Sequence, residues 1–311
     1  MAYPLSIVDE RPLPAAYRGP VWVSDVDKTY LSTRFSSLQG LARIPLEFAI
    51  DKLAIPGMPE VLRAIRHGPR EAYAAVPLYF LSASPAQLRA VLERKMLLDG
   101  VEWDGLVLKD WARALLSGRP GRLREQLGFK LAALLTLRRG RPLATEWLIG
   151  DDTEQDALAY ALYARILSGE LRAGPLDEAL REAGVAPDDR ACVDALARGL
   201  PPQGGQVERA FIHLERRTDP ASFAALGERV VPVRDATQLA LALFALGQLR
   251  AEGVIQAGAA AAAGRRPLDR AALLEDALAR GLVTPGTLAR LPPDFHPSTA
   301  RARGPQPGAA P

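Results

Sequence analysis

The sequence predicts an α/β fold in which a parallel sheet is flanked by helices on both faces. Between residues 21 and 250, short apolar runs of strand length alternate with helical segments. Several of these runs are continuously hydrophobic, which is typical of strands that are buried on both faces. Polar clusters follow three of the runs, and in such sheets ligands bind beyond the carboxyl ends of the strands. We therefore expect the functional site at that edge.

The individual elements follow from the same patterns in chain order. The apolar runs predict strands at 21–25, 76–81, 106–108, 146–152, 210–214 and 229–233. Helical periodicity and capping signals predict helices within 36–67 and at 85–97, 129–137, 152–168, 235–250 and 267–282. The central region therefore has the strand–helix alternation of a doubly wound sheet.

The flanking segments predict a simple organisation around this central domain. Residues 1–20 are rich in proline and are expected to form an irregular, extended arm. Residues 21–250 form the expected domain, with a helical insertion at about 169–205. Residues 251–311 are expected to be an Ala-rich linker or weak helix, a short helix and a disordered tail.

Composition argues against several classes of function. The formal net charge is only +3, and arginines are spread along the 311 residues, so we expect no nucleic-acid partner. Local groups such as Arg119, Arg122 and Arg124 are expected on a solvated helix face, or else in a patch that attracts anions. The single Cys192 excludes an intramolecular disulfide. No apolar run reaches roughly 18 residues, and no signal peptide is visible, so we expect a cytoplasmic protein.

Four polar clusters carry the functional argument. In chain order they are Asp25-Val26-Asp27, Ser82-Ala83-Ser84-Pro85, Lys130, and Gly150-Asp151-Asp152 with Asp156. Each alone has an ordinary structural explanation, such as a solvated turn, a helix N-cap or a surface lysine. Together they suit phosphoryl transfer, because a carboxylate that attacks an anionic phosphate ester needs magnesium and a lysine to cancel repulsion. Magnesium prefers oxygen ligands, which the acids supply.

In this order the clusters resemble the motif set of the haloacid dehalogenase superfamily. The chain is more closely similar to one branch, the catalytic domain of actin-patch-associated phosphatidate phosphatases. The similar segments are V-S-D-V-D-K-T at 23–29, P-G-M-P-E-V-L-R at 56–63, Y-F-L-S-A-S-P-A-Q-L at 79–88, L-V-L-K-D-W at 106–111, G-F-K at 128–130 and L-I-G-D-D-T-E-Q-D at 148–156. The resemblance implies a three-layer, Rossmann-like sheet with a minimal cap. It also implies phosphatase activity.

The resemblance implies a role for each matching catalytic residue. Asp25 would attack phosphorus and form an aspartyl-phosphate, while Asp27 would act as general acid and then as general base. Ser82 would donate a hydrogen bond to the transferring phosphoryl group, and Lys130 would neutralise its charge. Thr29 is expected only to stabilise its own turn, and Ser84 to cap the following helix.

The resemblance also implies a magnesium site at the same edge. Asp25, the main chain of Asp27 and Asp151 would bind Mg²⁺. A further acid would stand beside the ion, and the motif leaves open whether this is Asp152 or Asp156. The chain departs from the family pattern at Lys28, Ala86, Phe129 and Asp152, where the family favours Gly, an aromatic residue, His and Ser. These departures leave the substrate open.

Several functional hypotheses therefore remain open. The first is a phosphatase of a lipid at a membrane surface or of another bulky phosphoester, favoured by the short connections around Asp27, Ser82 and Lys130. The others are a phosphatase of a soluble metabolite or nucleotide, and a non-catalytic regulator that binds phosphorylated ligands. A receiver module and a glycosyltransferase each explain only part of the motif set. The 169–205 segment is expected to contact a protein partner or a second copy.

Overall fold

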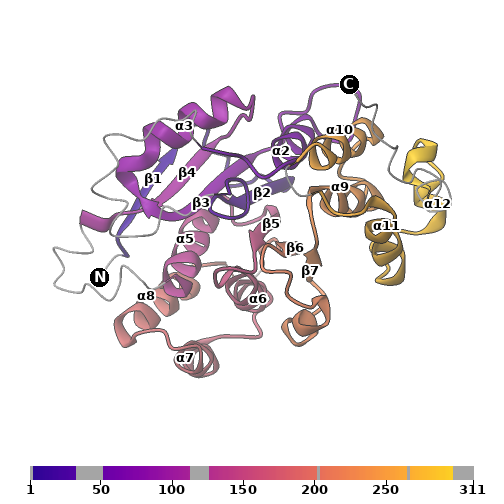
Figure 1. Cartoon of the computed structure of the whole chain (residues 1–311). Coiled ribbons are helices and arrows are strands. Elements are labelled where there is room, and N and C mark those ends of the chain that lie inside the picture. Colours follow the sequence, from indigo (N-terminus) through magenta and orange to yellow (C-terminus); the bar gives the residue numbers. More distant parts are fainter. Residues whose placement is uncertain (1–2, 33–51, 113–125, 202–203, 265–266, 297–311) are drawn as a thin grey trace. The chain divides into compact units, whose positions relative to one another are not determined.

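The computed structural model describes residues 3–32, 52–112, 126–201, 204–264 and 267–296 (Figure 1). The chain divides into two compact units. The first comprises residues 1–54 and 76–232 and contains the sheet, and the second comprises residues 55–75 and 233–311. The boundary expected near residue 250 coincides with neither end of the second unit. Within the described residues, no helix is both long enough and apolar enough to span a bilayer.

A seven-stranded, mostly parallel sheet forms the centre of the first unit. Its strands are β1 (Leu5–Asp9), β2 (Pro20–Asp25), β3 (Leu78–Pro85), β4 (Gly105–Lys109), β5 (Thr145–Asp151), β6 (Val207–His213) and β7 (Val230–Val233). They lie in the order β1-β4-β3-β2-β5-β6-β7. β2 pairs in parallel with both β3 and β5, so the carboxyl ends of these three strands lie at one edge. The α/β fold with a mostly parallel sheet is confirmed.

Strand β1 corrects the expectation of an irregular N-terminal arm. Leu5–Asp9 pairs antiparallel with β4, and Leu5 lies opposite Lys109. The strand is only partly buried, as edge strands are, so its hydrophobic pattern is weak beside the surrounding prolines. Its pairing satisfies backbone groups of β4 that would otherwise face outward.

The two faces of the sheet bury different sets of side chains. The helices of the first unit are α3 (Arg89–Leu98), α5 (Leu127–Gly140), α6 (Asp156–Leu167), α7 (Ala173–Glu182) and α8 (Pro187–Arg198), with 3₁₀ helices η3 (Ala86–Leu88) and η5 (Pro220–Leu226). Val23 and Leu148 share one buried cluster with Leu135 of α5 and Tyr160 of α6. On alternate positions, the rings of Trp22 and Trp147 stack 5.2 Å apart. This packing fixes α5 and α6, which carry site residues, against the strands.

The segment at 169–205, expected to be a helical insertion, contains α7 and α8. Leu176 and Leu180 of α7 and Val193 of α8 are buried in the same cluster as α5 and α6. The segment is therefore part of the core of the first unit, and burial of these side chains stabilises that unit.

The second unit is helical and depends on small residues. It contains α2 (Met58–His67), α9 (Ala236–Ala245), α10 (Ala251–Ala262), α11 (Arg270–Ala279), α12 (Pro285–Leu288) and η6 (Pro293–Phe295). A Cβ at Gly57 would lie 2.7 Å from the carbonyl oxygen of Ala257, and one at Gly253 would lie 2.7 Å from the Cβ of Ala64. The Ala-rich segment, expected as a linker or weak helix, is thus largely helix α10, in which small side chains permit close packing against α2. Residues 297–311 of the expected tail lie outside the described residues.

Candidate active site

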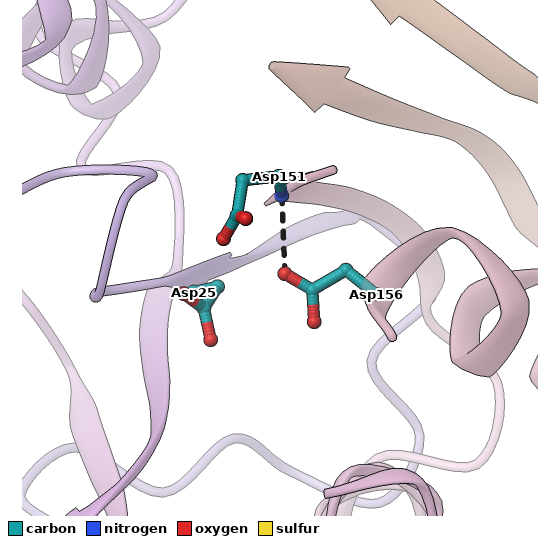
Figure 2. A group of neighbouring side chains, drawn as sticks. All are labelled: Asp25, Asp151 and Asp156. Atoms are coloured by element: carbon teal, nitrogen blue, oxygen red, sulfur yellow. Dashed lines mark hydrogen bonds between the residues drawn. The ribbon is translucent and has the colours of Figure 1, made fainter. Parts of the chain in front are cut away.

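Three aspartates converge at the carboxyl edge of the sheet (Figure 2). Asp25 ends β2, Asp151 ends β5 and Asp156 begins α6. One carboxylate oxygen from each lies within 4.8 Å of the others, and all three residues are buried. The main-chain N–H of Asp151 donates to Oδ2 of Asp156 at 3.1 Å, the dashed line in Figure 2. Because β2 and β5 are parallel neighbours, the sheet itself places Asp25 beside Asp151.

Lys130 brings a buried cation into this cluster. Its Nζ lies 3.0 Å from Oδ1 of Asp25 and 2.9 Å from Oε2 of Glu154, and it also pairs with Asp156. Burial alone would lower the pKa of Lys130, but Asp156, Asp25 and Glu154 outweigh burial and raise that pKa well above its usual value. Lys130 is therefore a permanent ammonium group here. Sequence reasoning missed Glu154, whose only signal was its place in the acidic loop that precedes α6.

The cluster holds more acidic groups than one buried lysine can neutralise. Four carboxylates, those of Asp25, Asp151, Glu154 and Asp156, face one ammonium group. Burial raises the pKa of Asp25 well above its usual value and that of Asp156 to about 7, although Lys130 opposes both shifts. Burial likewise raises the pKa of Asp151. Uncompensated charge in such a place is costly, so the cluster favours a bound cation.

Asp25 gives a direct test of whether a cation fits. Both of its carboxylate oxygens are buried, and neither is in hydrogen-bonding geometry with any group in the described part of the chain, although Oδ1 is close to Lys130. Buried carboxylate oxygens are ordinarily hydrogen bonded or bound to a metal ion. The three aspartates offer only oxygen donors, which are the ligands of Mg²⁺ and Ca²⁺. The residues therefore fit a hard divalent cation.

Asp27 is held by two serines. Its Oδ2 accepts hydrogen bonds from Oγ of Ser82 at 3.0 Å and from Oγ of Ser84 at 2.8 Å. The expectation that Ser84 is an N-cap is wrong, because β3 continues through Pro85 and helix η3 begins there without a side-chain cap. The hydroxyl of Ser84 is thus part of the site. The S-x-S-P spacing was the available signal, since alternate residues of a strand face the same side.

The structure also places Thr29, expected only to stabilise its own turn, and Asp152, one of two candidates for the further acid beside the ion. The hydroxyl of Thr29 donates to Oδ2 of Asp151 at 3.3 Å, so it links its own turn to the end of β5. The carboxylate of Asp152 turns to the loop that follows β6. There it accepts from the N–H of Arg216 at 2.9 Å and from the hydroxyl of Thr218 at 2.6 Å. Asp156, and not Asp152, therefore stands beside Asp25 and Asp151.

Lys28 ties the loop after β2 to the loop after β6. Its backbone has φ of +65°, a left-handed conformation that is uncommon for a residue other than glycine. Its Nζ pairs with Glu215 at 3.0 Å, and its carbonyl oxygen lies 3.2 Å from Nδ1 of His213. These contacts fix the backbone around Asp27. The arginines at 119, 122 and 124, and residues 33–51, lie outside the described residues, so the expectations of an anion-attracting patch and of a minimal cap stay predictions.

Comparison with known proteins agrees with this geometry. Residues 21–173, just under half of the chain, match the family model of the catalytic domain of phosphatidate phosphatase APP1. The matched range contains all four motif clusters and ends where helix α7 begins. The match indicates a phosphatase, that is, a phosphoric monoester hydrolase. No curated protein and no solved structure matches the chain significantly.

Proposed function

We propose that the chain is a magnesium-dependent phosphatase of the haloacid dehalogenase type, which acts through an aspartyl-phosphate on Asp25. Its proposed substrate is a lipid phosphomonoester of the phosphatidate kind or another bulky phosphoester. The observation that carries the proposal is the placement of Asp25, a buried carboxylate without hydrogen-bonding partners among the described residues, beside Lys130 and two further aspartates. A nucleophile, a fixed cation and oxygen ligands for a metal thus share one sheet edge.

The proposed metal site uses the residues that the sheet brings together. Asp25, Asp151 and Asp156 would hold Mg²⁺, with the main-chain carbonyl of Asp27 as a further oxygen donor. When bound, the ion would supply positive charge that offsets the substrate phosphate and keeps the Asp25 carboxylate ionised. Lys130 contributes a second positive charge and holds Asp25 in place from α5.

In the first half-reaction, a carboxylate oxygen of Asp25 forms a bond to phosphorus and the phosphorus–ester oxygen bond breaks. The electron pair of that bond stays with the leaving oxygen, which takes a proton from Asp27, and the alcohol departs. The hydroxyl of Ser82 donates to an oxygen of the transferring phosphoryl group. Lys130 neutralises charge on the same group.

In the second half-reaction, a water oxygen forms a bond to phosphorus while Asp27 accepts a proton from that water. The bond between Asp25 and phosphorus breaks, and its electron pair returns to the Asp25 carboxylate. Inorganic phosphate leaves, and Asp27 again carries the proton that it gave up in the first step. One carboxyl group thus serves as acid and then as base, which requires it to stay aimed at the same point in space.

The lipid part of the proposal is supported by the family match. Phosphatidate phosphatase is the activity for which the family is named, and its model covers the motif clusters. The short connections between Asp27, Ser82 and Lys130 also favour a site open to bulky substrates. Peripheral attachment to a membrane from the cytoplasm would suit such a substrate.

Phosphate release by purified protein tests the proposal. Wild type, Asp25→Asn and the control Asp177→Asn, an exposed position on α7, would each be assayed with Mg²⁺ or EDTA. The substrates would be phosphatidate in mixed micelles and a panel of soluble phosphomonoesters. We expect Mg²⁺-dependent release that falls about a thousandfold or more in Asp25→Asn and is kept in the control.

Two results would count against this proposal. Rapid turnover of soluble esters with none of phosphatidate would make the chain a metabolite phosphatase. No release from any substrate by folded wild-type protein would favour a regulator that binds phosphorylated ligands without catalysis.

A further inference from the structure

We infer that Ser84 is a positioning residue that holds Asp27 in place while the hydroxyl of Ser82 is engaged by substrate. The inference rests on the proposed function, because it concerns the general acid of that reaction. It starts from the two hydroxyl groups that donate to one atom, Oδ2 of Asp27.

Asp27 and the substrate phosphoryl group would compete for the single hydroxyl proton of Ser82. Its hydroxyl has one proton to donate, and its oxygen already accepts the main-chain N–H of Ser84 at 2.9 Å. In the described structure that proton goes to Asp27. In the proposed reaction the same proton is needed by an oxygen of the phosphoryl group. Ser82 can serve one of these acceptors at a time, so binding of substrate removes its hydrogen bond from Asp27.

Ser84 does not face this competition. Its hydroxyl lies 2.8 Å from Oδ2 of Asp27, and its side chain is fully buried. It belongs to β3, which is fully buried along its length, and it lies at the irregularity between the Ser82 and Pro85 pairs with β4. Its main-chain N–H is held by Oγ of Ser82 at 2.9 Å. A buried donor on a strand of the sheet keeps its position when the ligand state changes. Asp27 therefore keeps the hydrogen bond from Ser84 at every stage of the reaction.

Asp27 needs such support because of where it stands. It lies beyond the end of β2, in the turn that contains the left-handed Lys28. As general acid it must place its proton within hydrogen-bond reach of the ester oxygen as the phosphorus–oxygen bond breaks. Ser84 transfers no proton and touches no reacting atom. It fixes the rotamer of the carboxyl group that does.

The test uses two substrates that differ in their need for an acid. The alkoxide of an alkyl phosphate leaves poorly without a proton, whereas p-nitrophenyl phosphate releases p-nitrophenolate, a stabilised anion. Ser84→Ala would be compared with wild type and with the control Ser222→Ala, an exposed position on η5 whose hydroxyl donates to the main-chain carbonyl of Asp219. Release of the alcohol would be followed in a single turnover, so that hydrolysis of the phosphoenzyme does not contribute.

We expect Ser84→Ala to slow release from the alkyl ester about tenfold to a hundredfold, with at least tenfold less effect on the nitrophenyl ester. A loss of equal size for both esters, or no loss for either, would overturn the inference. Absence of turnover in wild type would instead count against the proposed function, so the two failures are distinguishable.

Inhibition by inorganic phosphate provides a second readout. Ser82→Ala should raise the inhibition constant of phosphate several-fold, because Ser82 is the proposed phosphoryl contact, and Ser84→Ala should raise it much less. If both variants weakened phosphate inhibition equally, Ser84 would be a substrate-binding residue and the inference would be wrong.

Discussion

Asp152 and Asp156 belong to the same acidic loop region but turn to different partners. Asp156 lies against Asp151 and Lys130, whereas Asp152 accepts hydrogen bonds from the loop after β6. Sequence alone could not separate them, because both follow the same glycine and aspartate. The separation depends on α6 beginning at Asp156, which points that side chain back to the strand. At the scale of single residues, metal affinity should follow this geometry.

We expect Asp156→Asn to weaken Mg²⁺ binding about 10–100-fold, a typical cost for groups that support a metal site. Asp152→Ala should keep an affinity close to that of wild type but lower the free energy of unfolding by about 1–2 kcal/mol, through loss of its hydrogen bonds. Calorimetric titration with Mg²⁺ and denaturant unfolding measure the two effects. The reverse ranking of the two variants in metal affinity would show that Asp152 is the metal residue.

The raised pKa of Asp156 gives a prediction about pH. Its carboxyl group has a pKa of about 7 in the folded, metal-free protein and about 3.8 when unfolded, so the folded state binds this proton more tightly. The contribution of this proton to the free energy of unfolding is fully present below about pH 4 and is lost as pH rises through about 7. Mg²⁺ competes with the proton, so its stabilising effect should grow over the same range.

Melting temperatures in EDTA and in Mg²⁺ at about pH 5 and about pH 8 test this linkage. We expect a clearly larger gain from Mg²⁺ at the higher pH. An equal gain at both values would mean that the ion binds at groups other than this cluster.

Much of the site was predictable at this scale, and the reasons for the misses are physical. Residue order at strand ends predicted that Asp25, Asp27, Ser82 and Asp151 lie together, because parallel strands bring such ends to one edge. Lys130, which lies on α5, was named from the motif set. Glu154 and Ser84 were missed because their contacts depend on where α5 places Lys130 and on how far β3 extends. The position of Lys130 and the end of β3 are set by tertiary packing, so the S-x-S-P spacing could indicate Ser84 only once the strand was known to extend to Pro85.

At the scale of elements, the close contact between β5 and α6 determines where Asp156 stands. A Cβ on Gly150 would lie 2.5 Å from Oδ2 of Asp156 and 2.7 Å from its Cβ, which is closer than real contacts allow. Only glycine lets the helix start so near the strand. Gly150 is therefore a determinant of the geometry of the proposed metal site, although it supplies no ligand.

We expect Gly150→Ala to displace Asp156 and to weaken Mg²⁺ binding by about tenfold or more. Gly174→Ala on α7 is the matched control, since nothing lies within 4 Å of its added Cβ. Calorimetry of folded protein gives the comparison. Wild-type affinity in both variants would show that the approach of α6 to β5 is not what positions the metal residue.

Sequence patterns predicted most of the helices and strands. They missed or left in doubt the elements whose structure depends on packing against neighbouring elements. The continuous apolar runs of β2, β3, β4 and β5 were visible because both faces of these strands are buried. Strand β1 was missed because an edge strand shows little burial pattern. Helix α10 was doubtful because its alanines and glycines have weak amphipathicity, and their purpose is close packing within the second unit.

At the scale of the whole molecule, the division into two units was not visible in the sequence. Helix α2 lies between β2 and β3 in the chain, yet it groups with helices from residue 233 onward. Such a pairing is long-range, and helical periodicity carries no information about which partner a helix will choose. The sheet unit, by contrast, contains every residue to which the proposed chemistry is assigned.

The central claim, that Asp25 carries the phosphoryl group, has a direct test in chemical trapping. Protein mixed with substrate and Mg²⁺ would be quenched within one turnover and treated with borohydride, which reduces an aspartyl-phosphate to homoserine. Mass spectrometry would then locate the modified residue. We expect homoserine at position 25, formed only with substrate present, and none at Asp27, Asp151 or Asp156. Homoserine at any of those residues, or none anywhere while alcohol is released in a burst, would contradict the account.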